Sequence, residues 1–207
     1  MSAITAGFVP AFLGGLLLNI SIAGASLALG LALGGPLALL RLGGGAPGRL
    51  AGTLTAALRV APTFVVMFFL LNLLPASAML GPWPVPLHGP VVVVLSLVVY
   101  STAYVSDTGL DAIRHWRAGA HELSLLFLPA LARALFVLVM ASSTGAAIGV
   151  NEAVTVTLRQ AQALGSVGDR LLLFGAVILF FTCLLQGAFL LVERLRLRLV
   201  AHATSGR

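Results

Sequence analysis

The sequence predicts an all-α, polytopic membrane protein with about five transmembrane helices, and three observations carry that prediction. Of the 207 residues, 59% are hydrophobic and only 9% are charged, against about 25% in an ordinary soluble domain. The apolar stretches are long enough for a bilayer core about 30 Å thick, which needs roughly 20 residues per helix. They are also continuous rather than alternating, which argues against a transmembrane β-barrel.

The first apolar block is longer than one membrane span. Residues 2–40 carry no charge, and a helix of that length would extend about 58 Å. Part of it must therefore lie outside the hydrocarbon core. We predict a span over 11–33 that ends at Gly34-Gly35-Pro36, with residues 1–10 along the membrane surface.

Prolines divide the next charge-poor block, because proline removes a backbone donor and breaks helices. They stand at Pro75, Pro82, Pro84, Pro86 and Pro90. We predict a span over 54–74, a loop over 75–89 with Trp83 as an interface anchor, and a third span over 90–108. The β-branched run Val91–Val94 also suits a strand. In lipid, however, an open strand leaves backbone groups unsatisfied, so we predict a helix.

The remaining spans are predicted over 124–142, which contains Arg133, and over the charge-free stretch 171–192. Together the five spans form one transmembrane domain over 1–207. All 12 basic residues are arginines. With the amino end outside and the carboxyl end in the cytoplasm, eight loop and tail arginines are cytoplasmic and two are external. The positive-inside rule favours this topology, and we expect a multi-pass protein of the bacterial inner membrane.

No catalytic or metal-binding motif is present in the sequence. Cys183 is the only cysteine, so neither an internal disulfide nor a cysteine metal site is expected. His115 and His121 are six residues apart, a poor spacing for two ligands on one helix face. Gly43-Gly44-Gly45 lacks the Lys-Ser/Thr of a phosphate-binding loop. We therefore expect no enzymatic activity and no cofactor bound by this chain.

The polar segments between spans allow functional and structural interpretations. The stretch 107–122 is either a solvated loop or a docking element for a cytoplasmic partner. The small and hydroxyl residues of 141–152 suit close helix packing, or a broken helix beside a polar path. Glu152 is either functional or exposed at the interface, while Arg59 and Arg133 are expected to snorkel towards the headgroups. Hydrogen bonds between helices are expected from Asn19, Ser21, Ser96 and Tyr100.

Six short motifs in the correct order resemble one family of membrane proteins. They are Arg59-Val-Ala-Pro62, Ala103-Tyr-Val-Ser-Asp107, the positions Ile113, Gly119 and Glu122, Leu128-Pro-Ala-Leu-Ala-Arg133, Ile148-Gly-Val-Asn-Glu152 and Val192-Glu-Arg194. In order and spacing, from about residue 11 to 198, they resemble the permease subunits of bacterial ABC importers for polar amino acids. In that family a cytoplasmic loop with a Glu-Ala-Ala motif forms a short helix that seats in the ATPase and transmits its closure.

The sequence departs from the family at this loop. Gly119-Ala-His-Glu122-Leu-Ser stands in place of the family's Gly-Gln-x-Glu-Ala-Ala, and about 12 residues before Pro129, some three helical turns, are missing. The resemblance still implies an ATPase-coupling loop made by Asp111, Ile113, Arg114, Arg117, Gly119, His121 and Glu122. Because the loop is short, we expect it to bury less surface against the ATPase.

The resemblance implies a permease subunit that forms half of a translocation path for polar amino acids. The path residues would be Tyr100, Tyr104, Ser142, Ser143, Thr144, Asn151 and Glu152. The implied partners are an ABC ATPase that uses ATP and Mg, a second permease subunit in a homo- or heterodimer, a periplasmic substrate-binding protein and membrane lipid, with no nucleic acid. The shortened loop favours an alternative, a degenerate accessory or assembly subunit that does not transport. A proton-coupled carrier needs a carboxylate buried within a span, and the sequence places none there.

Overall fold

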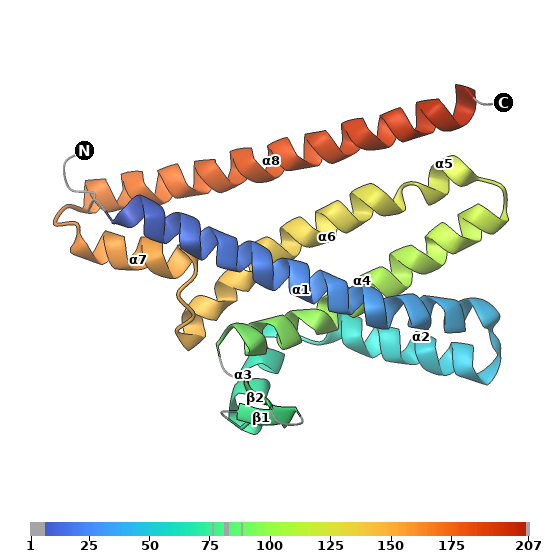
Figure 1. The fold of residues 1–207 in the computed structure, drawn as a ribbon, viewed down its shortest axis with the longest axis horizontal. Helices are drawn as coiled ribbons and strands as arrows, with labels where there is room; N and C mark the ends of the chain where they lie inside the picture. Colours follow the sequence, from blue (N-terminus) through green and yellow to red (C-terminus); the bar gives the residue numbers. More distant parts are fainter. Residues whose placement is uncertain (1–6, 76, 81–82, 88, 206–207) are drawn as a thin grey trace.

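The computed structural model describes residues 7–75, 77–80, 83–87 and 89–205, which form an elongated helical bundle (Figure 1). Helix α1 runs along most of its length, and the long helix α8 lies along one side. The helices are α1 (Phe8–Gly43), α2 (Gly45–Val60), α3 (Thr63–Leu73), α4 (Pro90–Arg117), α5 (His121–Ser124), α6 (Phe127–Ser142), the 3-10 helix η1 (Ser143–Ile148), α7 (Ala153–Ala163) and α8 (Val167–Ser205). The all-α prediction is confirmed.

Small residues allow α1 to lie directly against α4. A Cβ atom added to Gly34 would stand 2.6 Å from the carbonyl oxygen of Thr102, and one added to Gly30 would overlap the side chain of Ser101. The hydroxyl of Ser101 donates to the α1 backbone at Ser26 over 2.7 Å. Close backbone approach through glycine is a common way to pack helices in membranes, where lipid removes the hydrophobic driving force.

Helix α1 does not end where the sequence predicted. It continues through Pro36 to Gly43, so the end at Gly34-Gly35-Pro36 is wrong. Gly34 and Ala38 are both buried, and they hold the helix against its neighbours on either side of the proline. Packing of this kind compensates for a proline inside a membrane helix. Of the surface segment predicted over 1–10, residues 1–6 lie outside the described part of the chain, and Phe8–Pro10 belong to α1.

The segment predicted as a span near 54–74 is not one straight helix, because it is interrupted between Val60 and Thr63. Helices α2 and α3 meet at an angle of 93°. Pro62 lacks the N–H that would continue α2, and Ala61 before it is extended with ψ of 121°, as is usual before proline. A short antiparallel hairpin, β1 (Ser77–Leu80) and β2 (Trp83–Pro86), follows in place of the predicted loop. The side chain of Trp83 lies outside the described residues.

The third span is helical as predicted but longer. Val91–Val94 are helical, and α4 continues from Pro90 to Arg117. The stretch 107–117 is therefore helix rather than loop. The backbone turns only at Gly119, whose φ is +77°, a conformation that glycine adopts without strain. Helix α6 (Phe127–Ser142) lies close to the predicted span 124–142. Helix α8 (Val167–Ser205) contains the predicted span 171–192 and extends beyond it at both ends. The sequence did not predict α7 as a separate helix.

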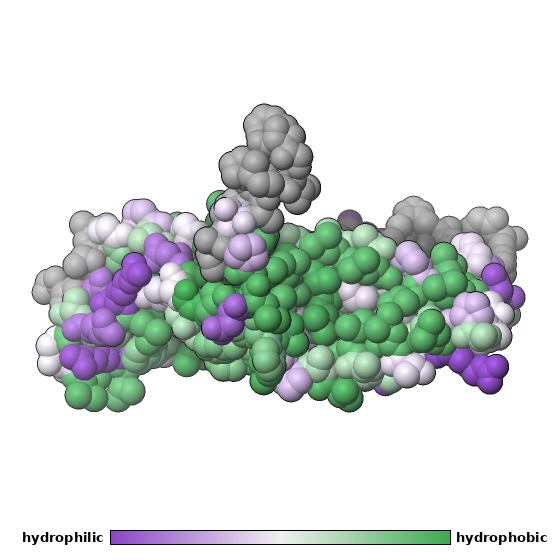
Figure 2. Space-filling view, turned by 90° about the horizontal axis from the view of Figure 1, so that it is seen from below, coloured by the Kyte–Doolittle hydropathy of each residue, from purple (hydrophilic) through white to green (hydrophobic). Residues whose placement is uncertain are grey.

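The surface of the bundle is that of a multi-pass membrane protein. Within the described residues, four helices are long and apolar enough to cross a membrane, or up to five if the bent pair α2–α3 counts as one span. Hydrophobic residues cover the middle of the bundle and hydrophilic ones gather towards its two ends (Figure 2). Helix α8 exposes large side chains along its length, among them Leu172 at 74% and Ile178 at 66%.

Candidate functional site

The predicted coupling loop folds as a tight corner between two helices, which we call the elbow (Arg114–Leu126). Helix α4 ends when the amide of Ala118 donates to the carbonyl of Arg114 over 3.0 Å. Gly119 reverses the chain, and α5 adds a single turn. The rings of Trp116 and His121 meet edge to face at 4.4 Å between centroids, which ties the two arms together. The corner is therefore short and internally braced.

The residues predicted for ATPase coupling divide by exposure. Asp111, Arg114, Arg117, Gly119 and Glu122 are exposed, whereas Ile113 and His121 are half-buried. The elbow also exposes apolar side chains that the prediction omitted, namely Trp116 at 58%, Leu123 at 48% and Leu126 at 41%. Exposed apolar groups beside charges are a usual composition for a protein-binding surface. For Leu123 and Leu126, the signal in the sequence was the apolar run that follows Glu122.

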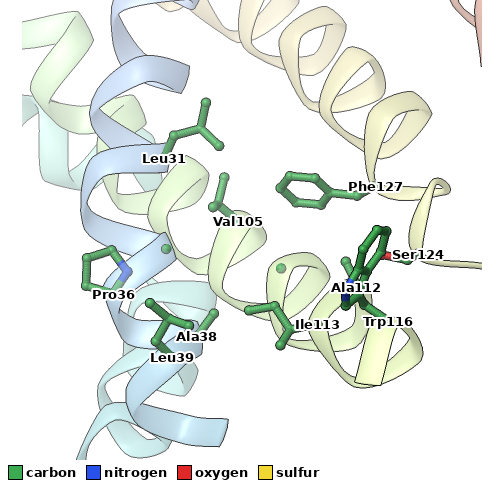
Figure 3. Close-up of a pocket in the computed structure, with 12 residues that line it drawn as sticks. Leu31, Pro36, Ala38, Leu39, Val105, Ala112, Ile113, Trp116, Ser124 and Phe127 are labelled. Carbon is green, nitrogen blue, oxygen red and sulfur yellow. The ribbon is translucent and has the colours of Figure 1, made fainter. Parts of the chain in front are cut away.

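An apolar groove of about 570 Å³ lies between α1, α4 and the start of α6 (Figure 3). Side chains from these three elements point into it, and Ser124 of α5 adds the one hydroxyl in this set. Of the predicted coupling residues, Ile113 lines it. The wall consists of Leu31, Gly35, Pro36, Ala38, Leu39, Val105, Gly109, Ala112, Ile113, Trp116, Ser124 and Phe127. This lining suits hydrocarbon rather than a polar solute.

Glu152, predicted for the substrate path, is completely buried and caps α7. Its carboxylate accepts from the amides of Val154 at 2.9 Å and Thr155 at 2.8 Å, and from the hydroxyl of Thr155 at 2.9 Å. The Nδ2 atom of Asn19 in α1 donates to the same carboxylate over 3.2 Å. Every one of these partners is neutral. The alternative that Glu152 is exposed at the interface is therefore wrong.

Asn19 joins Glu152 to a second predicted path residue, Ser142. The Nδ2 atom of Asn19 lies 2.7 Å from the Ser142 hydroxyl, and its Oδ1 atom accepts from the amide of Ala153 over 3.1 Å. We call Asn19, Ser142, Glu152 and Thr155 the Glu152 cluster. Asn19, Ser142 and Glu152 have no exposed surface, so these three residues connect α1, α6 and the start of α7 inside the bundle, while Thr155 is half-buried. Asn19 is the partner that the sequence reading expected to bond between helices but did not assign to the site.

The two tyrosines of the predicted path lie one turn apart on α4. Their ring centroids are 5.9 Å apart. The hydroxyl of Tyr104 donates to the backbone carbonyl of Ala130 over 3.1 Å, which ties α4 to α6. Ser21 and Ser96, also expected to bond between helices, instead donate to carbonyls of their own helices.

The other predicted path residues lie elsewhere. In η1, Ser143 is half-buried. The hydroxyl of Thr144 donates to the backbone carbonyl of Ala141, three residues earlier in the chain. Asn151 is exposed and accepts from Arg159 over 2.9 Å. Asn151 and Arg159 line a second cavity of about 260 Å³, together with Gly7, Phe8, Ala11, Val156 and Gln160. The seven predicted path residues therefore do not form a single pocket in this chain.

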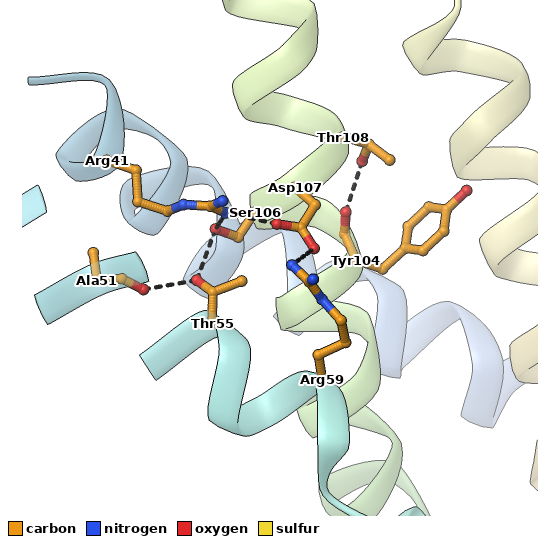
Figure 4. A network of polar contacts seen from close by, with 8 residues as sticks. All are labelled: Arg41, Ala51, Thr55, Arg59, Tyr104, Ser106, Asp107 and Thr108. Atoms are coloured by element: carbon orange, nitrogen blue, oxygen red, sulfur yellow. Dashed lines mark hydrogen bonds and ion pairs between the residues drawn. The ribbon is translucent and has the colours of Figure 1, made fainter. Parts of the chain in front are cut away.

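A second polar cluster links α1, α2 and α4 (Figure 4). Arg41 donates to Asp107 Oδ1 over 2.8 Å and to the Ser106 hydroxyl over 2.9 Å. Arg59 contacts the other oxygen, Asp107 Oδ2. The hydroxyls of Thr55 and Ser106 lie 3.1 Å apart. We call these five residues the Asp107 cluster. Sequence reasoning missed it as a unit, although Arg59 opens one family-like motif and Asp107 closes another.

The two arginines expected to snorkel have protein partners. Arg59 forms the ion pair with Asp107. The guanidinium carbon of Arg133 lies 5.8 Å from the centre of the Phe189 ring, a cation–π distance that joins α6 to α8.

Comparison with known proteins identifies the fold. No protein-family model matches the sequence, and no curated protein matches it. One solved structure, described as an amino acid ABC transporter with histidines, matches with a TM-score of 0.65. The alignment covers 92% of this chain and 95% of that chain at 17% sequence identity. At this identity the likeness shows a shared fold, and it agrees with the family resemblance of the sequence motifs.

Proposed function

We propose that the chain is the transmembrane permease subunit of an ABC importer for polar amino acids. One observation carries the proposal: nearly the whole chain has the fold of a chain in an amino acid ABC transporter. Because the sequence contains no phosphate-binding loop, ATP and Mg would be bound by a separate ATPase subunit. A second permease subunit would complete the translocation path, and a periplasmic protein would deliver the solute.

The distribution of arginines supports an orientation for this subunit. The α1–α2 turn, the elbow and the carboxyl-terminal part of α8 lie at the same end of the bundle (Figure 1). Arg41, Arg49, Arg114 and Arg117 belong to this end, and α7 with Arg159 lies at the other. By the positive-inside rule, this distribution supports an orientation with the elbow in the cytoplasm, where an ATPase would dock, and the amino end outside. The expected location is the bacterial inner membrane.

Topology reporters test this orientation directly. A reporter fused after Arg198 is expected to give a cytoplasmic signal, and one inserted at Pro84 a periplasmic signal. The reverse pair of signals would contradict both the orientation and the docking surface that depends on it.

The docking surface is tested by charge reversal at the elbow. We expect Arg117→Glu or Glu122→Arg to weaken co-purification with the ATPase roughly fivefold, which corresponds to about 1 kcal/mol. Arg159→Glu, at the opposite end of the bundle, is the matched control and is expected to change nothing. If both elbow variants retain the ATPase as fully as the control does, the elbow is not the docking surface.

The shortened elbow favours one alternative, an accessory subunit that does not transport. Helix α5 has only four residues, so it offers little surface to a partner. Amino acid uptake by cells that lack this chain separates the two functions. Loss of uptake, restored by the intact chain, supports the permease, whereas normal uptake supports the accessory subunit.

A further inference from the structure

The carboxylate of Asp107 is shared by two arginines that are buried to different degrees. The side chain of Arg41 is 18% exposed and that of Asp107 is 29% exposed. The side chain of Arg59 is 58% exposed. The two arginines come from different helices, α1 and α2, and each contacts a different carboxylate oxygen. The two ion pairs therefore differ in how far the rest of the chain encloses them.

Arg41 belongs to the buried side of this arrangement. Besides Asp107, it donates to the hydroxyl of Ser106, which contacts the hydroxyl of Thr55. Thr55 and Ser106 have no exposed surface. A charged group whose hydrogen-bond partners are buried is costly to separate, because the separated groups stay desolvated. Arg41 thus holds α1 to α4 whatever Arg59 does.

Arg59 lies at the break between α2 and α3. The extended residues Ala61 and Pro62 follow it closely, and there the chain turns through 93°. Before the break, buried Gly48, Ala51 and Thr55 hold α2 in place. Beyond it, Met67 is the one fully buried side chain of α3. Leu70 and Leu71 of α3 also pack against the core that contains Met67. Two extended residues between two separately packed helices have the form of a hinge.

We propose that the Arg59–Asp107 ion pair is a releasable latch that sets the angle between α2 and α3. An exposed ion pair stabilises weakly and is screened by salt. When the ion pair between Arg59 and Asp107 opens, Asp107 keeps Arg41 as its counter-ion. Release therefore leaves no unpaired carboxylate, which is the usual obstacle to opening an ion pair inside a protein. The second arginine makes the latch reversible.

The latch concerns the isolated chain and goes beyond the proposed transport function. It is tested on the full chain in lipid nanodiscs by the distance between two spin labels. With Cys183→Ser as background, labels at Leu54→Cys on α2 and Leu73→Cys on α3 report the angle, since both leucines are exposed. We expect one narrow distance distribution for this background. Arg59→Gln is expected to broaden it at least twofold.

Matched variants separate the latch from general destabilisation. Arg49→Gln removes another exposed arginine of α2 and is expected to leave the distribution unchanged. Asp107→Glu keeps the carboxylate and is expected to keep the distribution narrow. Sodium chloride at 1 M is expected to broaden the Arg59-containing protein but not Arg59→Gln. If Arg59→Gln and Arg49→Gln give the same narrow distribution, the latch does not exist.

The division of roles between the arginines has its own test. Arg41→Lys keeps the charge, and is expected to lower thermal stability while leaving the label distance narrow. If Arg41→Lys broadens the distance as much as Arg59→Gln does, without loss of stability, Arg59 is not the releasable partner. None of these readouts needs an ATPase or a solute, so the latch and the transport function succeed or fail separately.

Discussion

Two carboxylates in this chain show how differently an acid can be accommodated in a membrane bundle. Glu152 is fully buried and is held by neutral donors: two backbone amides, one hydroxyl and one side-chain amide. Asp107 is partly exposed and is held by two arginines. The first carboxylate is fixed by dipoles that cannot leave without remaining unsatisfied. The second carries one negative charge and is paired with two positively charged arginines.

The comparison teaches that burial and partner type decide what an acidic residue does, more than its place in a motif. Both residues close motifs that resemble those of importer permeases. Buried polar groups with a complete set of partners rigidify a structure. An exposed ion pair with a spare counter-ion is able to open. Glu152 therefore belongs to the scaffold between α1, α6 and α7, and Asp107 to the place where α2 bends into α3.

The largest expected effect comes from removing the buried carboxylate. We expect Glu152→Ala to lower the free energy of unfolding by about 3 kcal/mol, because it removes the acceptor of the part-buried amides of Val154 and Thr155 and leaves the buried Asn19 without one of its partners. Asp169→Ala, at an exposed carboxylate in the first turn of α8, is the control. Thermal unfolding in nanodiscs measures the difference. Equal stabilities for the two variants would contradict the scaffold role of Glu152.

The next effect tests whether the Glu152 cluster acts as one unit. Asn19→Ala is expected to cost about 2 kcal/mol, since it removes the donor to both Ser142 and Glu152. Ser21→Ala lies on the same helix, bonds only within it and should cost little. A double-mutant cycle of Asn19→Ala with Ser142→Ala should be non-additive by more than about 0.5 kcal/mol. Additive losses would show that the two helices are fixed independently.

The smallest effects compare the two arginines of the Asp107 cluster. Arg41→Gln is expected to cost about 1.5 kcal/mol, because its hydrogen bonds lie in a largely buried network. Arg59→Gln is expected to cost about 0.5 kcal/mol, as is usual for an exposed pair. The same unfolding measurement ranks them. A larger loss for Arg59→Gln than for Arg41→Gln would reverse the assignment of the two partners.

The sequence predicted the architecture because the length and hydropathy of each segment decide whether that segment forms a membrane-spanning helix. The continuous apolar blocks gave helices rather than strands, including the valine run at 91–94, since backbone groups in lipid must bond within their own segment. The helix boundaries were harder to predict. Pro36 lies inside a helix while Pro62 breaks one, and the two prolines differ in the packing around them rather than in their immediate sequence.

The polar clusters were less predictable from sequence for a similar reason. Glu152 meets a side chain 133 positions earlier in the chain, and Asp107 meets partners 66 and 48 positions earlier. No local pattern encodes such pairs. The motif resemblance singled out Arg59 and Asp107 separately, and chain folding placed them in contact. The exposed charges of the elbow, by contrast, could be predicted because they lie next to one another along the chain.

The sequence by itself determined that the chain spans a membrane as a helical bundle and that its arginines favour one end, because transfer to lipid depends on composition over about 20 residues. Only the tertiary structure decided that one carboxylate is closed inside the bundle and the other is shared by two arginines at a bend. Burial and pairing depend on which distant helices touch, and here glycine and other small residues of α1 set that contact.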